Sequence, residues 1–311
     1  MPSLNSKTTE EIALGIRQRV FLHTMRHNGG YLSQACSAAE SLAILYNEFL
    51  KLGEPTLPGV PLPFAGVPSA ANPDAFTGAG YHGPFAPDYD RFIISPAHYA
   101  LVIYSALIET GRMDEHALDH FNKDGSSVEM IGAEHSPGME VTTGSLAQGL
   151  SMAAGIAWAR KRKGETGKVW VYMSDGEFQE GQTWETLAAI SHHEIDNLRI
   201  VVDVNRQQCD GAMSSVLDLG DLPGRVGSFG ITTHAIDGHD LDAFRTAANA
   251  VEPGKALMIL ANTSPFQGME FLKRRFPRLH YVRFKSPAER QEMLHAIAGE
   301  IGLDPATIER N

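Results

Sequence analysis

The chain has 311 residues, of which 43% are hydrophobic and 20% are charged, a composition typical of a globular protein with a large hydrophobic core. Its net charge of −11 provides no basic field for nucleic acid or an anionic membrane, so we expect neither as a partner and expect a small-molecule ligand instead. Two cysteines, no apolar run of the roughly 20 residues that a membrane span needs, and an N-terminus without a signal-peptide pattern indicate a cytoplasmic protein.

The N-terminal part of the chain divides into a helical and an irregular stretch. Residues 8–50 show the apolar spacing of two helices, separated by a Gly-Gly pair at 29–30. Residues 52–90 hold eight prolines and six glycines in 39 positions, too many for regular elements. Because this stretch is also rich in aromatic residues, we predict an ordered loop on a surface or at an interface, not a solvated linker.

Beyond the loop, apolar runs alternate with helical stretches. Strands are predicted at 91–96, 168–174, 198–205, 233–237 and 256–263, and helices near 98–111, 145–163, 181–193 and 240–251. Such alternation is typical of a doubly wound α/β fold, with a mainly parallel sheet and helices on both faces. We expect this domain to span residues 1–285, and a C-terminal helical tail with a Ser-Pro start signal to span 286–311.

Polar residues follow two of the predicted strands. Asp175 and Gly176 come directly after the run at 168–174, and Asn205 ends the run at 198–205. One βαβ unit places these ends on neighbouring strand tips, where ligands of parallel sheets bind. One carboxylate, one amide oxygen and a backbone carbonyl near Gln207 would suffice for Mg²⁺. The alternative is an ordinary strand-to-helix turn with Asp175 near a helix N-cap.

The segment SDGEFQEGQTWETLAAISHHEIDNLRIVVDVNRQQCDG, residues 174–211, resembles the thiamine-diphosphate motif of transketolases. Further blocks follow the order of that family at 37–46, 90–107, 137–157, 235–240, 259–263 and 279–284. The length is similar to that of the diphosphate-binding half of transketolases that are split between two polypeptides. The resemblance implies the diphosphate-binding domain of the thiamine-diphosphate fold, with thiamine diphosphate and Mg²⁺ (or Ca²⁺ or Mn²⁺) as cofactors.

The same resemblance implies roles for individual residues. Asp175, Asn205 and the main-chain oxygen of Gln207 match the metal ligands, and His98 and His280 match histidines beside the reacting carbon, which gives both a catalytic role. Without its surrounding block, His98 would be interpreted as a solvent-exposed histidine at a helix N-terminus. The positions that match cofactor-binding residues are His98, Gly144, Ser145, Leu146, Ser174, Asp175, Gly176, Glu177, Asn205 and His280.

Two departures from the family concern the substrate. Tyr31 stands where transketolases carry a histidine, and Ala133 stands near the place of another substrate-site histidine. These changes leave the identity of the donor sugar open.

The family also needs a glutamate from a separate pyrimidine-binding domain, which is not expected within 311 residues. The resemblance therefore implies a companion C-terminal subunit that carries this domain, in an α2β2 assembly. Glu180 and Glu185 match family glutamates at the interface between the two halves of the enzyme.

The activity implied by the resemblance is transfer of a two-carbon ketol unit from a phosphorylated or otherwise anionic ketose to an aldose, only in the presence of the partner. Two alternatives stay open. One is the decarboxylating component of a 2-oxo acid dehydrogenase, which uses the same cofactor fold. The other is a non-catalytic phosphate-binding or regulatory subunit, against which the intact Asp175, Asn205 and His98 argue. The sequence has no Walker-type phosphate loop.

Overall fold

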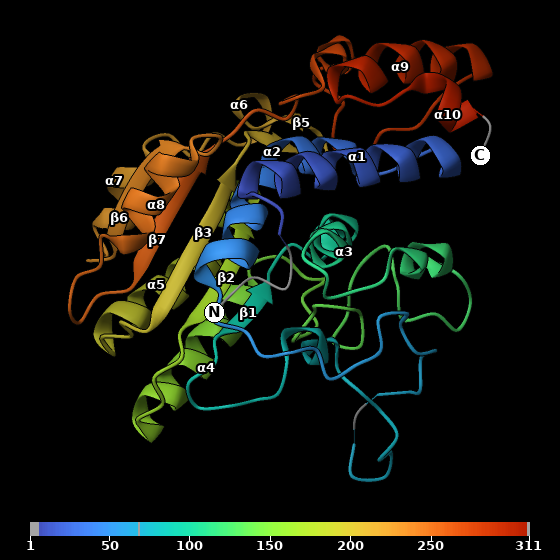
Figure 1. Cartoon of the computed structure of the whole chain (residues 1–311). Helices are drawn as coiled ribbons and strands as arrows, with labels where there is room; N and C mark the ends of the chain where they lie inside the picture. The colour runs from blue at the N-terminus through green and yellow to red at the C-terminus, as the bar shows by residue number, and fades with distance from the viewer. Residues whose placement is uncertain (1–5, 68, 310–311) are drawn as a thin grey trace.

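The computed structural model describes residues 6–67 and 69–309; Pro68 of the Pro/Gly-rich stretch, and residues 1–5 and 310–311 of the predicted domain and tail, lie outside the described residues. Five strands form one sheet in which every neighbouring pair is parallel. In sheet order these are β1 (Arg91–Ile94), β2 (Val169–Ser174), β3 (Leu198–Val204), β7 (Leu257–Asn262) and β6 (Thr232–Asp237) (Figure 1). The predicted parallel α/β sheet is therefore confirmed.

Helices cover both faces of this sheet, which confirms the doubly wound arrangement. On one face, a single apolar core includes residues of α1 (Thr9–His27), α2 (Leu32–Ile44), α3 (Ala100–Glu109) and α8 (Leu241–Asn249). On the other face, a second core includes residues of α4 (Gln148–Lys163), α5 (Gly181–His192) and α7 (Leu222–Gly227). Successive strand residues alternate between the two cores, since Tyr172 belongs to the first and Val171 to the second.

The turn between α1 and α2 forms where the Gly-Gly pair is. Helix α1 begins with a capping box, in which Thr8 Oγ accepts a hydrogen bond from Glu11 N at 3.2 Å and Glu11 Oε2 accepts one from Thr8 N at 2.7 Å. It ends at Asn28, whose φ of 55° lies in the left-handed region. This turn brings Tyr31, directly before α2, to the carboxyl end of the sheet, where it lines the cavity described below.

The Pro/Gly-rich stretch at 52–90 contains a single short 3₁₀ helix, Gly78–His82, among its described residues. In Figure 1 the stretch forms the blue-to-cyan coil at the bottom of the view, on the side of the molecule away from β6 and β7. Gly78 is required where the coil meets the segment before α4, because a Cβ there would lie 1.7 Å from Ser136 O. The proposed contact of this loop with a partner stays a prediction.

Two features near the strand tips differ from the sequence-based expectation. Helix α4 begins at Gln148, three residues later than predicted, because Ala147 adopts a left-handed φ of 67° that a helix cannot continue. Residues 145–147 therefore belong to a loop. After β3 the chain forms an unpredicted small hairpin, β4 (Gln207–Gln208) and β5 (Gly211–Ala212), followed by the one-turn helix α6 (Met213–Val216).

The C-terminal segment consists of two helices, α9 (Pro287–Glu300) and α10 (Pro305–Glu309), where one was expected. Ser286 caps α9 as predicted, by accepting a hydrogen bond from Glu289 N. Helix α9 runs beside α1 (Figure 1), and the Arg290 guanidinium donates to Met25 O at 2.8 Å. Throughout residues 6–67 and 69–309, the helices all fall short of the length and apolar character that crossing a bilayer requires.

Candidate functional site

The predicted metal ligands follow the ends of two paired strands. In the register of β2 and β3, Ser174 lies opposite Asp203. Asp175 therefore comes one residue after the end of this pairing, and Asn205 two residues after it. The sequence-based expectation that these residues occupy neighbouring strand tips agrees with this geometry.

Asp175 is a buried carboxylate with one free oxygen. Asp175 is the first residue of a 3₁₀ turn, Asp175–Gln179, and its Oδ2 accepts a hydrogen bond from Arg206 N at 2.7 Å. The other oxygen, Oδ1, is buried and has no hydrogen-bond partner in the part of the chain that the structure describes. Burial, and then the negative charge of Asp203, raises the pKa of Asp175 to about 7. A cation at Oδ1 would compensate for both effects.

Asn205 is held from two sides. Its Nδ2 donates to Asp203 Oδ2 at 3.0 Å and to Tyr99 Oη at 3.3 Å, and its Oδ1 accepts from Gln207 N at 2.9 Å. Arg206, between Asn205 and Gln207, has a left-handed φ of 57°. This turn aims successive backbone N–H groups at the Asp175 carboxylate and the Asn205 amide, so the two side chains and the turn fix each other.

A cavity of about 400 Å³ lies over these strand tips. Its walls come from segments that are far apart in the sequence. Eight of the predicted site residues line it: His98, Gly144, Leu146, Ser174, Gly176, Asn205, Gln207 and His280. Gly144 and Gly176 face open space, since a Cβ on either would meet no atom within 4 Å. A ligand can therefore approach the backbone closely at both positions.

Histidine and tyrosine rings form one wall of this cavity. The His98 and His280 ring centroids lie 5.0 Å apart, and the Tyr31 ring lies 5.4 Å from His98 and 5.5 Å from His280. Burial, and then the neighbouring His280, lowers the pKa of His98 to about 3, and burial lowers the pKa of His280. Both rings are therefore neutral at pH 7 and can each offer one N–H donor and one acceptor nitrogen.

The structure does not bring every predicted residue into this cavity. Asp175 lines a second, larger cavity of about 760 Å³ on the other side of the turn at 205–207, while Asn205 and Gln207 line both. Ser145 is exposed and lines neither. Ala133 also lies outside both linings, in a turn where its N–H donates to Ser136 Oγ.

Glu177 is fully buried, and its carboxylate joins three segments. Its Oε1 accepts from Ala147 N at 2.9 Å and from Ser95 Oγ, and its Oε2 accepts from Ser174 N at 2.8 Å. These contacts tie the loop before α4 to the ends of β1 and β2. The Glu177 carboxylate thus supports the cavity wall and is not among the residues that line it.

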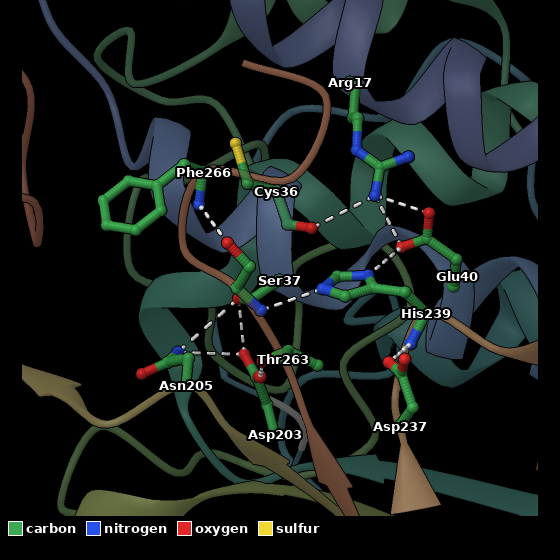
Figure 2. A network of polar contacts seen from close by, with 11 residues as sticks. Arg17, Cys36, Ser37, Glu40, Asp203, Asn205, Asp237, His239, Thr263 and Phe266 are labelled. Carbon is green, nitrogen blue, oxygen red and sulfur yellow. Dashed lines mark hydrogen bonds and ion pairs between the residues drawn. The ribbon is translucent and has the colours of Figure 1, made fainter. Parts of the chain in front are cut away.

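Sequence reasoning did not identify Asp203, which is the centre of a buried polar network (Figure 2). Its carboxylate accepts hydrogen bonds from Ser37 Oγ, Tyr99 Oη, Asn205 Nδ2 and Thr263 Oγ1. Burial raises the pKa of Asp203, and these hydrogen bonds act in the opposite direction. The available signal in the sequence is a single acidic residue inside the otherwise apolar end of the run LRIVVDV.

The residues present fit a divalent cation and an anionic group. Within the described residues, three or more His, Cys, Asp or Glu side chains do not gather anywhere in a metal-binding cluster. One carboxylate with one amide oxygen and a backbone carbonyl is instead the sparse oxygen set that Mg²⁺ uses when phosphate and water complete its shell. The free Asp175 Oδ1 and the open space at Gly144 and Gly176 are the observations that support this fit.

Comparisons with known proteins agree with one another. The family model described as "Transketolase, thiamine diphosphate binding domain" matches residues 36–263. A putative uncharacterized transketolase family protein of Sinorhizobium fredii is 39% identical over 213 residues, which cover 67% of this chain and 74% of that protein. One of the subunits of an apulose-4-phosphate transketolase from Actinobacillus succinogenes is 32% identical over 197 residues, which cover 63% of this chain and 71% of that protein.

Among solved structures, the transketolase of Campylobacter jejuni matches 96% of this chain with a TM-score of 0.74. The sequence identity is 21%, so this likeness shows the fold alone. The match covers 45% of the Campylobacter chain. The chain thus spans less than half of this transketolase but almost three quarters of the two shorter relatives.

Proposed function

This chain belongs to the transketolase family, and on that basis we propose that it is the thiamine-diphosphate-binding subunit of a two-chain transketolase. The assembled enzyme transfers a two-carbon ketol unit from a phosphorylated or otherwise anionic ketose to an aldose. One observation carries the proposal: a cavity lined by Gly144, Gly176, Asn205, His98 and His280 lies at the turn that binds Asp175, whose second carboxylate oxygen is free. A cytoplasmic location stays a prediction from the sequence.

In this proposal Asp175, Asn205 and the main-chain oxygen of Gln207 hold Mg²⁺, or Ca²⁺ or Mn²⁺ in its place. The remaining contacts to thiamine diphosphate come from cavity residues and their neighbours: His98, Gly144, Ser145, Leu146, Ser174, Gly176, Glu177 and His280. For Ser145 and Glu177 the contribution is weaker or indirect, because Ser145 is exposed and the Glu177 carboxylate is used by Ala147, Ser95 and Ser174.

When bound, thiamine diphosphate supplies the nucleophilic carbon and the electron sink for cleavage of a C–C bond next to a carbonyl. The residues of this chain orient oxygens and move protons. Because His98 and His280 are neutral, each can donate a hydrogen bond to a substrate hydroxyl or carbonyl from one ring nitrogen and accept a hydrogen bond at the other. The burial that lowers their pKa values also limits the access of water to the two rings.

Tyr31 is the residue that we propose to alter substrate recognition relative to transketolases with a histidine at this position. At the cavity wall its ring contacts His280 and Tyr281 edge-on and His98 at a tilt, so a phenol replaces an imidazole where a substrate hydroxyl would pass. Burial raises the pKa of Tyr31, which keeps it neutral. Ala133 lies outside the lining and has no comparable support.

The partner in this proposal is a companion subunit with the pyrimidine-binding domain, in an α2β2 assembly. A groove of about 440 Å³ between α4 and α5 supports the location of this contact, because it exposes Trp158 next to Gly155 and Glu185. At the rim of the cavity, Ile131 and Leu146 are also exposed apolar side chains. Each is an exposed apolar position that a second chain would cover.

The test is to co-purify this chain with its candidate companion, add Mg²⁺ and thiamine diphosphate, and supply either ketose donors with an aldose acceptor or 2-oxo acids. We expect two-carbon transfer without release of CO₂, and only when both chains are present. Release of CO₂ from a 2-oxo acid would instead support the decarboxylating alternative. Absence of both reactions, with cofactor bound, would favour a non-catalytic role.

A further inference from the structure

We propose that Asp203 is a positioning residue: it holds the Asn205 carboxamide in the one orientation that leaves its oxygen, and not its NH₂ group, available to the cation. This inference rests on the proposed function and adds to it a residue that is not itself a metal ligand. It concerns the orientation of a ligand and not the total charge of the site.

The contact between Asp203 and Asn205 joins a hydrogen-bond acceptor to a donor. A carboxylate oxygen accepts hydrogen bonds, whereas the amide of Asn205 has one donor end and one acceptor end. Asn205 Nδ2 lies 3.0 Å from Asp203 Oδ2. Rotating the amide by 180° would place Asn205 Oδ1 against that oxygen, so two acceptors would face each other. Asp203 therefore selects one of the two orientations.

The other contacts of Asn205 favour the same orientation, and two of them do so through Asp203. Tyr99 Oη and Ser37 Oγ lie 3.3 Å and 3.5 Å from Asn205 Nδ2, and because each donates its single hydrogen to Asp203, each can only accept from Nδ2. On the opposite side, Gln207 N donates to Asn205 Oδ1 and favours the same orientation. That N–H belongs to the turn at 205–207, whereas Asp203 belongs to the buried end of β3.

Asp203 itself is fixed by residues from three parts of the fold. Ser37 Oγ on α2 donates to it at 2.6 Å, Tyr99 Oη before α3 donates at 2.7 Å, and Thr263 after β7 donates to its other oxygen. The next residue, Ser264, donates its N–H to His239 Nε2 at 2.8 Å. Figure 2 shows Asp203, Asn205 and Thr263 beside a second polar group, which consists of His239, Glu40 and Arg17.

His239 belongs to a largely buried chain of polar contacts that holds the loop after β7 from the other side. Its Nδ1 lies 3.0 Å from Glu40 Oε2, and the Arg17 guanidinium forms a salt bridge with the same carboxylate (Figure 2). Thr263 and Ser264 are therefore anchored by two separate polar groups. The orientation of Asp203, and through it that of Asn205, is thus set by helices α1 and α2 and by strand β7.

This arrangement is unfavourable for a purely structural purpose. Asp203 is a fully buried carboxylate whose hydrogen-bond donors are all neutral groups, and burying a charge without a charged partner is unfavourable. An apolar residue would fit the alternation of β3 as well. Such a departure from local rules is expected at a functional site.

The test measures binding of Mg²⁺ and thiamine diphosphate to the full chain by calorimetry. We expect Asp203→Ala to weaken binding roughly 10- to 100-fold, as for other residues that orient metal ligands. We expect Asp203→Asn to bind within a few-fold of the wild type, because its amide oxygen can still accept from Asn205 Nδ2. Asp90→Ala is the matched control: Asp90 is also a buried carboxylate but accepts from Lys51 N and Lys168 N at the opposite end of the sheet.

A second background separates positioning from a structural role. In Asn205→Asp the ligand is a carboxylate with two equivalent oxygens, so orientation no longer matters, and adding Asp203→Ala should cause no further loss of affinity. Equal losses in both backgrounds, or a loss in Asp203→Asn as large as in Asp203→Ala, would overturn the inference and leave the proposed function intact. Wild-type chain that binds no cofactor would overturn both. If Asp203→Ala does not fold, Asp203→Leu, an apolar residue that fills the space, takes its place.

Discussion

At the scale of single residues, burial determines which groups at the strand tips are left for a ligand to contact. Asp175 is 1% exposed, so its free Oδ1 cannot be satisfied by bulk water. Gly176 follows it without a side chain and leaves the adjoining backbone open to the cavity. A cation would bind the free oxygen of Asp175, and an anionic group would occupy the open space over Gly176.

A side chain that fills the open space at Gly176 should therefore weaken cofactor binding without unfolding the protein. We expect Gly176→Leu to weaken calorimetric binding of Mg²⁺ and thiamine diphosphate at least about tenfold, equal to about 1.4 kcal/mol. Gly181→Leu is the matched control, because a Cβ at Gly181 also meets no atom within 4 Å and Gly181 does not line the cavity. Similar affinities in the two variants would contradict a ligand at Gly176.

A second residue-scale prediction concerns pH. Burial, and then the charges of His27 and Arg26, lowers the pKa of His23 from 6.5 to about 3. The unfolded chain therefore binds a proton at this residue between pH 6.5 and pH 3 while the folded chain does not, and folding stability falls as the pH is lowered. For His23 we expect a loss of about 2 kcal/mol between pH 7 and pH 5.

The measurement is the free energy of unfolding in urea at both pH values. His23→Phe keeps an aromatic ring against Phe121, from which the His23 ring centroid lies 4.3 Å, and should remove this part of the pH dependence. An unchanged difference between pH 7 and pH 5 in His23→Phe would show that His23 is not the responsible group.

Which site residues the sequence reveals depends on how local their signal is. Asp175, Gly176 and Asn205 stand out because they interrupt apolar runs at strand ends, and the register of β2 and β3 then places them together. Asp203 lies inside such a run, so periodicity assigns it to the strand. Its role depends on Thr263, 60 residues later, and on Ser37, 166 residues earlier.

At the scale of elements, the cavity wall depends on how closely α4 approaches β1. A Cβ on Gly149 would lie 2.5 Å from Ser95 Oγ and 2.7 Å from Ser95 Cα. Ser95 also donates to Glu177, the carboxylate that fixes Ala147 before α4. The start of α4 and the loop that carries Gly144 are thus positioned by one close contact. The propensity of residues 145–147 for a helix is overridden by these contacts.

Gly149→Ala should therefore push α4 away from β1. We expect a loss of about 1–3 kcal/mol in the free energy of unfolding, as for other overpacked contacts. In the same helix, Gly155→Ala should increase it by about 0.5–1 kcal/mol, because a Cβ there meets no atom within 4 Å. Urea denaturation of both variants checks the pair. Equal effects of the two substitutions would contradict the close contact.

At the scale of the whole molecule, the parallel sheet and the helices on both of its faces follow from the alternation of strands and helices in the sequence, whereas the strand order, with β7 between β3 and β6, does not. The packing of α9 against α1 does not, because it joins residues that are far apart in the sequence, as in the contact from Arg290 to Met25. Buried residues of α9 such as Leu294 and Ile297 share one core with α1. The proposed boundary at 285 therefore separates two segments of sequence that share this core.

The exposed groove between α4 and α5 gives a whole-molecule prediction about assembly. We expect Gly155→Arg to place a charged side chain in this groove, next to Trp158, without disturbing the fold. In co-purification with the companion subunit, Gly155→Arg should be recovered in smaller amounts than Gly299→Arg. The control position, Gly299, lies in α9 with open space around it and is outside the groove. Equal recovery would place the partner elsewhere.

The most direct test of the whole account is calorimetric titration of the chain with Mg²⁺ and thiamine diphosphate, comparing the wild type with Asp175→Ala and with Asp124→Ala. Asp124 is an exposed aspartate in the loop between α3 and α4, so its replacement should leave the affinity unchanged. We expect the wild type to bind only when Mg²⁺ is present, and Asp175→Ala to show no Mg²⁺-dependent binding. Unchanged binding by Asp175→Ala would contradict the cation site at the tips of β2 and β3.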